Sequence, residues 1–458
     1  MAATARVCCL AAIFSVACGG NSGAPAQQSC PAASSCGGTS HNASSNAGTS
    51  IIDSNNAGQG GGSPSGVAGQ TTGGSPSGMA GSGGIAENGG VSGIGGDNTS
   101  GNGGASVQGG AGGSPGEAGT NNGGAAQGGS TGINPPPGFV LSPYKDTSIN
   151  FDWNNDIVST LVPGTRTPLV MDLPSNGGKA VTLAFATGEC GAENWGGVMG
   201  EAMAMANVAA YNAAGVDYAL ATGGAAGSFT CGSDAGMQSF IERWASPHLR
   251  GIDYDIEAGQ TPEVIHALIE RIPAAHAAHS DLRFSLTLAT LANNAGAEKA
   301  QSLGAGVAES LNQYGVTTLQ AVADVIGDWP SYLTVNLMTM DYGAPGMGVC
   351  VVKAGACEMG ESALQAAYNL HDKWGVPFAN IELTPMIGGN DVQGEHFTLN
   401  DVDTVMTFAL TQGLAGVHYW SYDRDTDCIQ DFASPTCNSL GNVGNHGFLT
   451  RFLAAMGN

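Results

Sequence analysis

Eight short apolar or β-branched segments alternate with helical segments over residues 139–458, and this alternation constrains the fold more than any other feature. Strands that alternate with helices are typical of parallel βαβ units, and eight such units close naturally into a barrel. We therefore predict an α/β fold, a (β/α)8 TIM barrel over residues 138–458. An open doubly wound sheet is the alternative, although no Gly-x-Gly-x-x-Gly motif follows the first segment to support a dinucleotide-binding version. The predicted strands are Phe139–Ser142, Val181–Thr187, Tyr218–Thr222, Leu249–Glu257, Phe284–Ala289, Leu333–Asp341, Ile381–Met386 and Val417–Tyr422.

Between these strands, two of the helical segments carry clear start signals. Thr261 stands before Pro262 and Glu263, and Asn400 stands before Asp401, so each offers a capping side chain followed by acidic residues in the first turn. The predicted helices include Val198–Ala213, Met237–Trp244, Pro262–His279, Ser362–Trp374 and Leu399–Gln412.

The first 18 residues have the features of an export signal. A single positive charge, Arg6, precedes an apolar run from Val7 to Ala17 that is too short for a bilayer-spanning helix of about 20 residues. Ser15–Gly19 resembles a bacterial lipoprotein processing box, in which Cys18 would become the lipidated first residue; simple cleavage after a small residue is the alternative. We expect an exported protein, either a cell-surface lipoprotein or a secreted one, that contacts a membrane only through such an N-terminal lipid anchor.

Residues 19–137 differ sharply in composition from the rest of the chain. They contain no aromatic residue and no Lys or Arg, and Gly, Ser, Ala and Asn dominate. Such a segment has too little apolar surface to offset the entropy of ordering it. We predict a disordered Gly/Ser/Ala-rich linker between the signal and the folded domain.

Acidic residues dominate the charge of the folded part. The formal net charge of the chain is −24, while the linker carries only Asp53, Glu87, Asp97 and Glu117. A phosphate backbone would be repelled by this domain, which excludes nucleic acid as the expected partner, whereas an uncharged polysaccharide fits. The histidines show no metal-ligand spacing, so we predict no metal and no other cofactor, and we expect a monomer.

Candidate catalytic residues lie on the strand Leu249–Glu257. Side chains alternate faces along a strand, so Asp253, Asp255 and Glu257 share one face, with successive Cα atoms about 7 Å apart. Repulsion among these carboxylates should keep at least one protonated near neutral pH, which places a proton donor beside a fixed anion, as general acid catalysis of glycoside cleavage requires. The alternatives are a solvated or Ca²⁺- or Mg²⁺-binding strand end and, less favoured, a phosphotransfer aspartate.

Strand ends also place aromatic residues at the expected mouth of the barrel, where the chemistry of this fold is found. Glu257, Asp341 and Trp420 should face the same mouth, and Trp420 should form a floor on which the apolar face of a sugar ring packs. Tyr144 and Trp195 are further candidate sugar platforms, with ordinary packing as the alternative for each aromatic residue. We expect His418 to be a hydrogen-bonded barrel residue rather than a ligand.

Over most of residues 139–458, motifs in the right order resemble those of glycoside hydrolase family 18 chitinases. Asp253–Glu257 resembles the end of the family's Asp-x-x-Asp-x-Asp-x-Glu strand, and Ala221–Gly224 resembles its Ser-x-Gly-Gly strand. Leu337–Gly343 is similar to the Met-x-Tyr-Asp strand, most closely in the chitinase D-like bacterial branch. Thr384–Gly388 and Tyr419–Asp425 resemble the seventh and eighth strands of that branch.

This resemblance implies hydrolysis of β-1,4-linked N-acetylglucosamine in chitin by a substrate-assisted retaining mechanism. Glu257 would be the general acid/base, and the 2-acetamido oxygen of the substrate would attack the anomeric carbon. Asp255 would orient the acetamido group, and Asp253 beneath it would share a proton. Asp341, at the end of the sixth strand, completes the candidate catalytic set.

Two departures from the family pattern concern the neighbours of these carboxylates. Arg250 stands at the position of the first Asp in the acidic motif, at what we expect to be the buried end of the strand. Met340 replaces a Tyr that the family uses on the acetamido group. Tyr342, which shares strand parity with Met338 and Met340, is the candidate replacement. Met338 and Tyr342 are therefore predicted substrate-binding residues, although directing both Asp341 and Tyr342 inward requires a twist or bulge.

Two alternative functions stay open at this stage. Family 18 also provides the scaffold of endo-β-N-acetylglucosaminidases that cleave N-glycan cores. A lectin-like chitin-binding protein could keep the barrel without turnover, but such relatives usually lose the terminal glutamate, and Glu257 is present here.

Eight cysteines follow Cys18, an even number in a chain expected to be exported, which favours disulfides over a metal site. Proximity in the sequence suggests the pairs Cys30–Cys36, Cys190–Cys231, Cys350–Cys357 and Cys428–Cys437. The last three would lie in loops at the mouth and rigidify the walls of the cleft.

Overall fold

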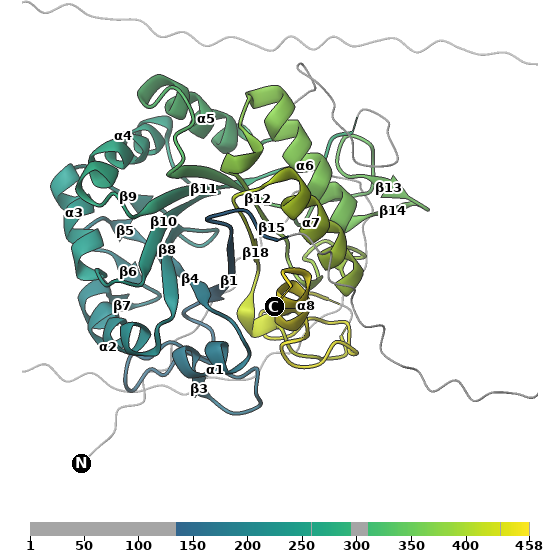
Figure 1. Ribbon diagram of the computed structural model, residues 1–458, viewed down its shortest axis with the longest axis horizontal. Helices are drawn as coiled ribbons and strands as arrows, with labels where there is room; N and C mark the ends of the chain where they lie inside the picture. Colours follow the sequence, from purple (N-terminus) through teal and green to yellow (C-terminus); the bar gives the residue numbers. More distant parts are fainter. Residues whose placement is uncertain (1–133, 258, 295–309, 431, 458) are drawn as a thin grey trace, which may run out of the picture. The chain divides into compact units, whose positions relative to one another are not determined.

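The computed structural model describes residues 134–257, 259–294, 310–430 and 432–457. A closed barrel of eight parallel strands forms its centre, and the helices lie around it (Figure 1). Each strand pairs with the next in the sequence and the last pairs with the first, which confirms the predicted (β/α)8 barrel. The barrel strands are β1 (Val140–Asp146), β4 (Ala180–Ala186), β8 (Asp217–Gly223), β10 (Leu249–Ile256), β11 (Arg283–Ala289), β12 (Leu333–Met338), β15 (Ile381–Thr384) and β18 (Gly416–Tyr419).

Helices follow the strands and confirm the five predicted segments to within a few residues. The α-helices are α1 (Leu169–Ser175), α2 (Gly200–Ala214), α3 (Asp234–Arg243), α4 (Pro262–Ala278), α5 (Gln313–Val325), α6 (Met359–Trp374), α7 (Leu399–Gln412) and α8 (Gly447–Ala455). Short elements lie in the connecting loops: β2 (Ser159–Thr160), β3 (Thr167–Pro168), β5 (Gly188–Glu189), β6 (Asn194–Trp195), β7 (Val198–Met199), β9 (Phe229–Thr230), β13 (Val352–Lys353), β14 (Ala356–Cys357), β16 (Gly388–Gly389), β17 (His396–Phe397), and the 3-10 turns η1 (Phe378–Asn380) and η2 (Tyr422–Arg424).

One of the two predicted helix starts is confirmed and the other is wrong by two residues. Thr261 caps α4, since its side chain accepts the Val264 N–H at 3.4 Å. Helix α7 is capped by Thr398 rather than Asn400, because Thr398 and Asp401 form a reciprocal capping box.

Strand β12 ends at Met338, three residues before the predicted end. The backbone adopts left-handed conformations at Asp341, with φ 49°, and at Gly343, with φ 105°. The N–H groups of residues 341 to 343 bond to side chains of another loop instead of a neighbouring strand. This change of direction ends the ladder and separates the side chain of Asp341 from that of Tyr342.

Strand β10 shows why this sequence closes into a barrel. Ile252, Tyr254 and Ile256 are buried in the main hydrophobic core that the strands share with the helices, and the hydroxyl of Tyr254 reaches Sδ of Met237 on α3 at 3.7 Å. Each such side chain contributes about 1.5–3 kcal/mol when removed from water. The alternate residues Asp253 and Asp255 therefore point into the barrel.

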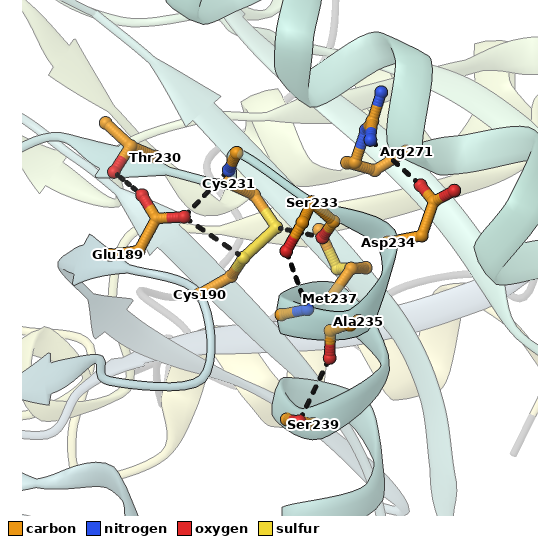
Figure 2. Close-up of a disulfide and its surroundings, with 12 residues drawn as sticks. Glu189, Cys190, Thr230, Cys231, Ser233, Asp234, Ala235, Met237, Ser239 and Arg271 are labelled. Atoms are coloured by element: carbon orange, nitrogen blue, oxygen red, sulfur yellow. Dashed lines mark hydrogen bonds and ion pairs between the residues drawn. A yellow bond between two sulfur atoms is a disulfide. The ribbon is translucent and has the colours of Figure 1, made fainter.

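Three disulfides join segments of the loops, as the sequence predicted. They are Cys190–Cys231, Cys350–Cys357 and Cys428–Cys437. Figure 2 shows the first, which links the loop that contains β5 to the segment between β9 and α3, beside the side-chain cap that Ser233 provides for α3. The predicted pair Cys30–Cys36 lies outside the described residues.

The predicted signal over residues 1–18, and the linker up to residue 133, also lie outside the described residues. Within the ranges that are described, none of the helices combines the length and the hydrophobicity that crossing a membrane requires.

Candidate active site

Asp253 forms the base of the carboxylate row inside the barrel. It is 2% exposed and accepts hydrogen bonds from Tyr144 Oη at 2.8 Å, Ser285 Oγ at 2.6 Å and Thr287 Oγ1 at 2.7 Å. Burial raises the pKa of Asp253, and these three donors oppose the rise. Asp253 is therefore held rigidly, with both carboxylate oxygens occupied by protein donors.

A second layer of side chains fixes the donors around Asp253. The amide nitrogen of Asn336 donates to Tyr144 Oη and to Thr287 Oγ1, both at 2.9 Å. Thr384 Oγ1 in turn donates to the amide oxygen of Asn336 at 2.8 Å. Because these residues come from β1, β11, β12 and β15, the network connects barrel strands that are far apart in the sequence.

Asp255 is the next inward residue on β10, and it has a different environment. It is 4% exposed, yet its Oδ1 has no hydrogen-bond partner among the described residues. Burial first, and then the charges of Glu257 and Asp253, raise the pKa of Asp255 well above its ordinary value. A buried, unpaired carboxyl oxygen is costly, and because Asp255 lines a pocket, a water molecule or a ligand can supply the missing donor there.

Glu257 is the outermost and most accessible of the three. Burial raises the pKa of its carboxyl group, the backbone N–H of Ala225 opposes the rise, and the charge of Asp341 adds to it. The direction agrees with the expected proton donor, because a raised pKa keeps a carboxylic acid protonated closer to neutral pH.

Strand β8 approaches β10 so closely beside Asp255 that only glycine fits. Gly223 has φ +88°, and a Cβ there would lie 2.2 Å from the carbonyl oxygen of Asp255. Gly224 has φ +81°, and a Cβ there would lie 2.9 Å from the ring of Phe185. The Gly224 N–H donates to the Asp255 carbonyl oxygen at 3.2 Å, which continues the pairing of the two strands past the end of β8. This contact explains the Gly-Gly pair that the sequence places after the third strand.

These carboxylates open into a pocket of about 300 Å³ at the carboxyl ends of the strands. Trp420 and Phe185 stack along one side of it, with ring centroids 5.6 Å apart and an interplanar angle of 21°. Glu257, Asp341 and Trp420 share this mouth, as expected. The pocket is lined by Tyr144, Asp146, Phe185, Ala225, Ala226, Asp255, Glu257, Thr287, Met338, Met340, Asp341, Thr384, Met386, Asp391 and Trp420.

A larger cavity of about 460 Å³ lies at the opposite end of the barrel, among the first residues of the strands. It contains none of the predicted site residues. Catalysis in this fold takes place at the carboxyl ends of the strands, so the smaller pocket is the candidate active site.

Asp341 reaches the pocket from the loop that follows β12. Its Oδ1 accepts the N–H groups of Asp391 at 2.7 Å and Val392 at 3.3 Å. Burial and the charge of Asp391 raise the pKa of Asp341, and the two N–H groups oppose the rise. Asp341 thus lines the same pocket as Glu257 and provides a second acid there.

Some predicted residues occupy other positions. Trp195 is 2% exposed and packs on Trp244, with ring centroids 4.9 Å apart, so it belongs to the core and not to a sugar platform. Tyr342 is buried and does not line the pocket, whereas Met338 does. Tyr144 lines the pocket, but its hydroxyl is engaged by Asp253.

The side chain of Arg250 is 52% exposed and pairs with Asp217, which corrects the expectation of a buried position.

His418 lies deeper in the barrel and has protein partners. Its Nδ1 is 2.8 Å from Ser142 Oγ, and its Nε2 is 3.5 Å from Glu382 Oε2. Burial alone would raise the pKa of Glu382, but Arg283 first and His418 next lower it to about 2. These contacts fit the expected structural role of His418.

Among the described residues, one group has spacing suited to a metal ion: Glu189 with Cys190 and Cys231. The two sulfur atoms of that group are joined in a disulfide, as Figure 2 shows, so they cannot act as thiolate ligands.

Comparisons with known proteins fit this geometry, although a scan against protein-family models returned no match. The chain is 38% identical over 102 residues to the probable bifunctional chitinase/lysozyme of Escherichia coli (strain K12), and 34% identical over 112 residues to endochitinase 11 of Metarhizium anisopliae. Each match covers 20% of this chain, and the two cover 11% and 19% of these relatives, so the chain spans only a small part of their length. The catalytic domain of the hyperthermophilic chitinase from Pyrococcus furiosus superposes with a TM-score of 0.51 at 24% identity, over 71% of this chain and 98% of that one.

Over part of its length, this chain is similar to chitinases. The resemblance predicted from its motifs is confirmed at that level, since the two curated relatives are named as chitinases and the superposed catalytic domain shows the same barrel fold. The assignment to a chitinase D-like branch stays a prediction.

Six pocket residues of this chitinase-like barrel lie outside the motifs and candidates named from the sequence: Asp146, Phe185, Ala225, Ala226, Thr287 and Asp391. Asp146 and Phe185 lie at the ends of β1 and β4, where a search of strand ends could have found them. Asp391 belongs to a loop that carries no strand or helix pattern, so only the tertiary structure places it at the pocket.

Proposed function

We propose that this barrel is a family 18 glycoside hydrolase that cleaves β-1,4-N-acetylglucosamine linkages in chitin with retention of configuration. The observation that carries the proposal is the unpaired, buried oxygen of Asp255 directly below Glu257, in a pocket whose side wall is aromatic. The chitinase-like sequence and fold support it.

Glu257 acts first as the acid. Its proton passes to the glycosidic oxygen, and the bond between that oxygen and the anomeric carbon breaks. The 2-acetamido oxygen of the same sugar attacks the anomeric carbon and forms an oxazolinium ion, so no protein nucleophile is needed. The raised pKa of Glu257 supplies the protonated form that this step requires.

Asp255 acts on the acetamido group. Its free Oδ1 accepts the acetamido N–H, which turns the acetamido oxygen toward the anomeric carbon and stabilises the positive charge of the oxazolinium ion. Asp253 below it holds its place through three hydrogen bonds. Water then attacks the anomeric carbon, Glu257 takes its proton, and the ring opens to restore the acetamido group.

Trp420 supplies the apolar surface on which the sugar ring rests, backed by Phe185. Met338 and Met340 line the pocket beside it and present no hydroxyl group, so Asp255 is the main polar contact proposed for the acetamido group. The substrate class is chitin or its oligosaccharides; in a second set of structures from Pyrococcus furiosus, catalytic site mutants of a thermostable chitinase domain are complexed with chito-oligosaccharides. The three disulfides support export to an oxidising compartment, as a lipoprotein or a secreted protein.

The test is hydrolysis of chitin oligosaccharides by the purified full chain, with product length and anomer identified by NMR. We expect β-anomeric products at first, and Glu257→Gln should lose nearly all turnover while it keeps its fold and its binding of oligosaccharide. Turnover retained by Glu257→Gln would refute the role of Glu257. Preferred cleavage of high-mannose glycopeptides would favour the endo-β-N-acetylglucosaminidase alternative, and binding by the wild type without any products would favour the lectin-like one.

A further inference from the structure

The loop after β15 is hydrogen-bonded to the loop that carries Asp341. Three consecutive N–H groups, those of Asp341, Tyr342 and Gly343, point toward this loop. Asn390 Oδ1 accepts the first at 3.1 Å, Glu395 Oε2 accepts the second at 3.0 Å, and Glu395 Oε1 accepts the third at 3.0 Å. Asn390 and Glu395 are each 3% exposed, so these contacts are shielded from water.

Such a row of N–H groups is a recognised anion-binding arrangement, which forms where the backbone enters left-handed conformations. Asp341 and Gly343 have such conformations here, with φ of 49° and 105°. A non-glycine residue with positive φ stores strain and persists only when surrounding contacts hold it. The carboxylate of Glu395 supplies two of those contacts.

Hydrogen bonds between the two loops run in both directions. Asp341 Oδ1 accepts the N–H groups of Asp391 and Val392, which belong to the loop that supplies Asn390 and Glu395. Asn390 is itself anchored, because its amide nitrogen donates to the carbonyl oxygens of Met386 at 3.0 Å and Gly388 at 3.2 Å. The position of the Asp341 carboxylate relative to Glu257 therefore depends on contacts made outside the pocket.

We propose that Glu395, with Asn390, is a positioning residue that holds Asp341 in the pocket beside Glu257 and thereby sets the charge that the proton donor experiences. The inference rests on the proposed function of Glu257. Neither Glu395 nor Asn390 lines the pocket, so their effect on the reaction passes through Asp341.

The other charged groups of the site make this effect measurable. The titratable carboxyl groups that line the pocket with Glu257 are those of Asp146, Asp255, Asp341 and Asp391, and the lining contains no Lys, Arg or His. Among these carboxylates, the charge of Asp341 acts to raise the pKa of Glu257, alongside burial, while Asp255 and Glu257 raise the pKa of each other as neighbouring acids. If Asp341 moves away, the pKa of Glu257 falls, and the alkaline limb of the kcat/KM profile moves to lower pH.

Glu395→Gln is the test variant, because the Gln amide group would oppose one backbone N–H with its own N–H. Burial raises the pKa of Glu395 to about 7, against the opposing effect of the two N–H groups, so a neutral side chain of the same shape changes the local charge little near neutral pH and acts mainly through the lost contact. We expect the alkaline limb of kcat/KM on chitin oligosaccharides to move down by about 0.5–1 pH unit, which is a loss of about 3- to 10-fold at pH values above the limb.

Asp427→Asn is a matched control within the same chain. Asp427 also accepts two consecutive backbone N–H groups, one per oxygen: Val443 at 2.9 Å and Gly444 at 2.8 Å, with Gly444 at φ 84°. It does not line the pocket. Asp427→Asn should therefore lower the melting temperature without moving the pH profile, which separates loss of positioning from loss of stability.

A readout without turnover keeps this test independent of the proposed function. In full-length protein labelled with 13C at the Glu carboxyl groups, Glu257 is assigned by the signal that disappears in Glu257→Gln, and its titration midpoint is compared between wild type and variant. A midpoint lowered in Glu395→Gln but not in Asp427→Asn supports the inference even if chitin is not the substrate. An unchanged midpoint in Glu395→Gln, or an equal shift in Asp427→Asn, overturns it while leaving hydrolysis of chitin intact. If Glu395→Gln does not fold, Asn390→Ala, which removes the acceptor for the Asp341 N–H, is read in the same way.

Discussion

The close approach of β8 to β10 at Gly223 leads to a quantitative prediction for Gly223→Ala. The added methyl group would lie 2.2 Å from the carbonyl oxygen of Asp255, where ordinary contact requires more than 3.4 Å. The left-handed backbone at Gly223, with φ 88°, adds a second penalty, because alanine avoids this region. The two strands must therefore separate beside the candidate catalytic residues.

Three contributions set the size of the effect. The left-handed conformation costs alanine about 1–2 kcal/mol, overpacking costs about 1–3 kcal/mol, and the lost bond from the Gly224 N–H to the Asp255 carbonyl oxygen costs about 1 kcal/mol. The sum is about 3–6 kcal/mol. A domain of about 320 residues has an unfolding entropy of about 0.7 kcal/mol/K, so the melting temperature should fall by about 4–9 °C.

Gly413→Ala isolates the steric part of this cost. Gly413 ends α7 with φ 72°, and a Cβ there would meet no atom within 4 Å. This control carries the conformational penalty alone, and its melting temperature should fall by about 1–3 °C. Differential scanning calorimetry of the two variants and the wild type, together with kcat on chitotetraose, tests the reasoning. We expect kcat to drop at least about 10-fold in Gly223→Ala only, since a displacement of about 1 Å beside reacting groups is costly. Equal destabilisation by the two variants, or full activity in Gly223→Ala, would refute the argument.

Two further predictions concern stability. Arg283 and His418 lower the pKa of Glu382 from its ordinary 4.5 to about 2, so the ionised form of Glu382 stabilises the fold. This stabilisation is present above pH 4.5 and is lost as the pH falls toward 2. It amounts to as much as about 3 kcal/mol. Urea unfolding at pH 7 and pH 2.5 should therefore show a smaller acid-induced loss in Glu382→Gln than in the wild type, and an equal loss would contradict the assignment. Among the disulfides, replacing Cys190 and Cys231 by Ser should lower the free energy of unfolding by roughly 4 kcal/mol, and replacing Cys350 and Cys357 by Ser should lower it by roughly 2.5 kcal/mol. The reason is that their sequence separations of 41 and 7 residues constrain the unfolded chain to different extents. Guanidinium titrations of the two double variants under oxidising conditions check this order, and the reverse order would show that native-state contacts of the loops outweigh the chain entropy.

The barrel and its carboxylate row follow from local patterns, so the sequence alone determined them. Strand periodicity placed Asp253 and Asp255 on one face, and the alternation of strands and helices placed Glu257 and Trp420 at one mouth, because strand ends gather there in any closed parallel barrel. The three described disulfides were predictable from the proximity of their cysteines in the sequence, and these cysteines lie in loops at that mouth.

Only the tertiary structure decided which neighbours complete the site. Strand parity alone directs Met340 and Tyr342 to the same side, yet the left-handed turn at Asp341 sends Asp341 into the pocket and buries Tyr342 elsewhere. No sequence pattern links Glu395 to that turn, because the contact joins two loops whose backbone is not periodic. Trp195 looked equally suited to a sugar platform or to the core, and its packing on Trp244 assigned it to the core. Periodic elements encode their faces in the order of their residues, whereas loops are placed by contacts between distant segments, and those contacts exist only once the barrel has closed.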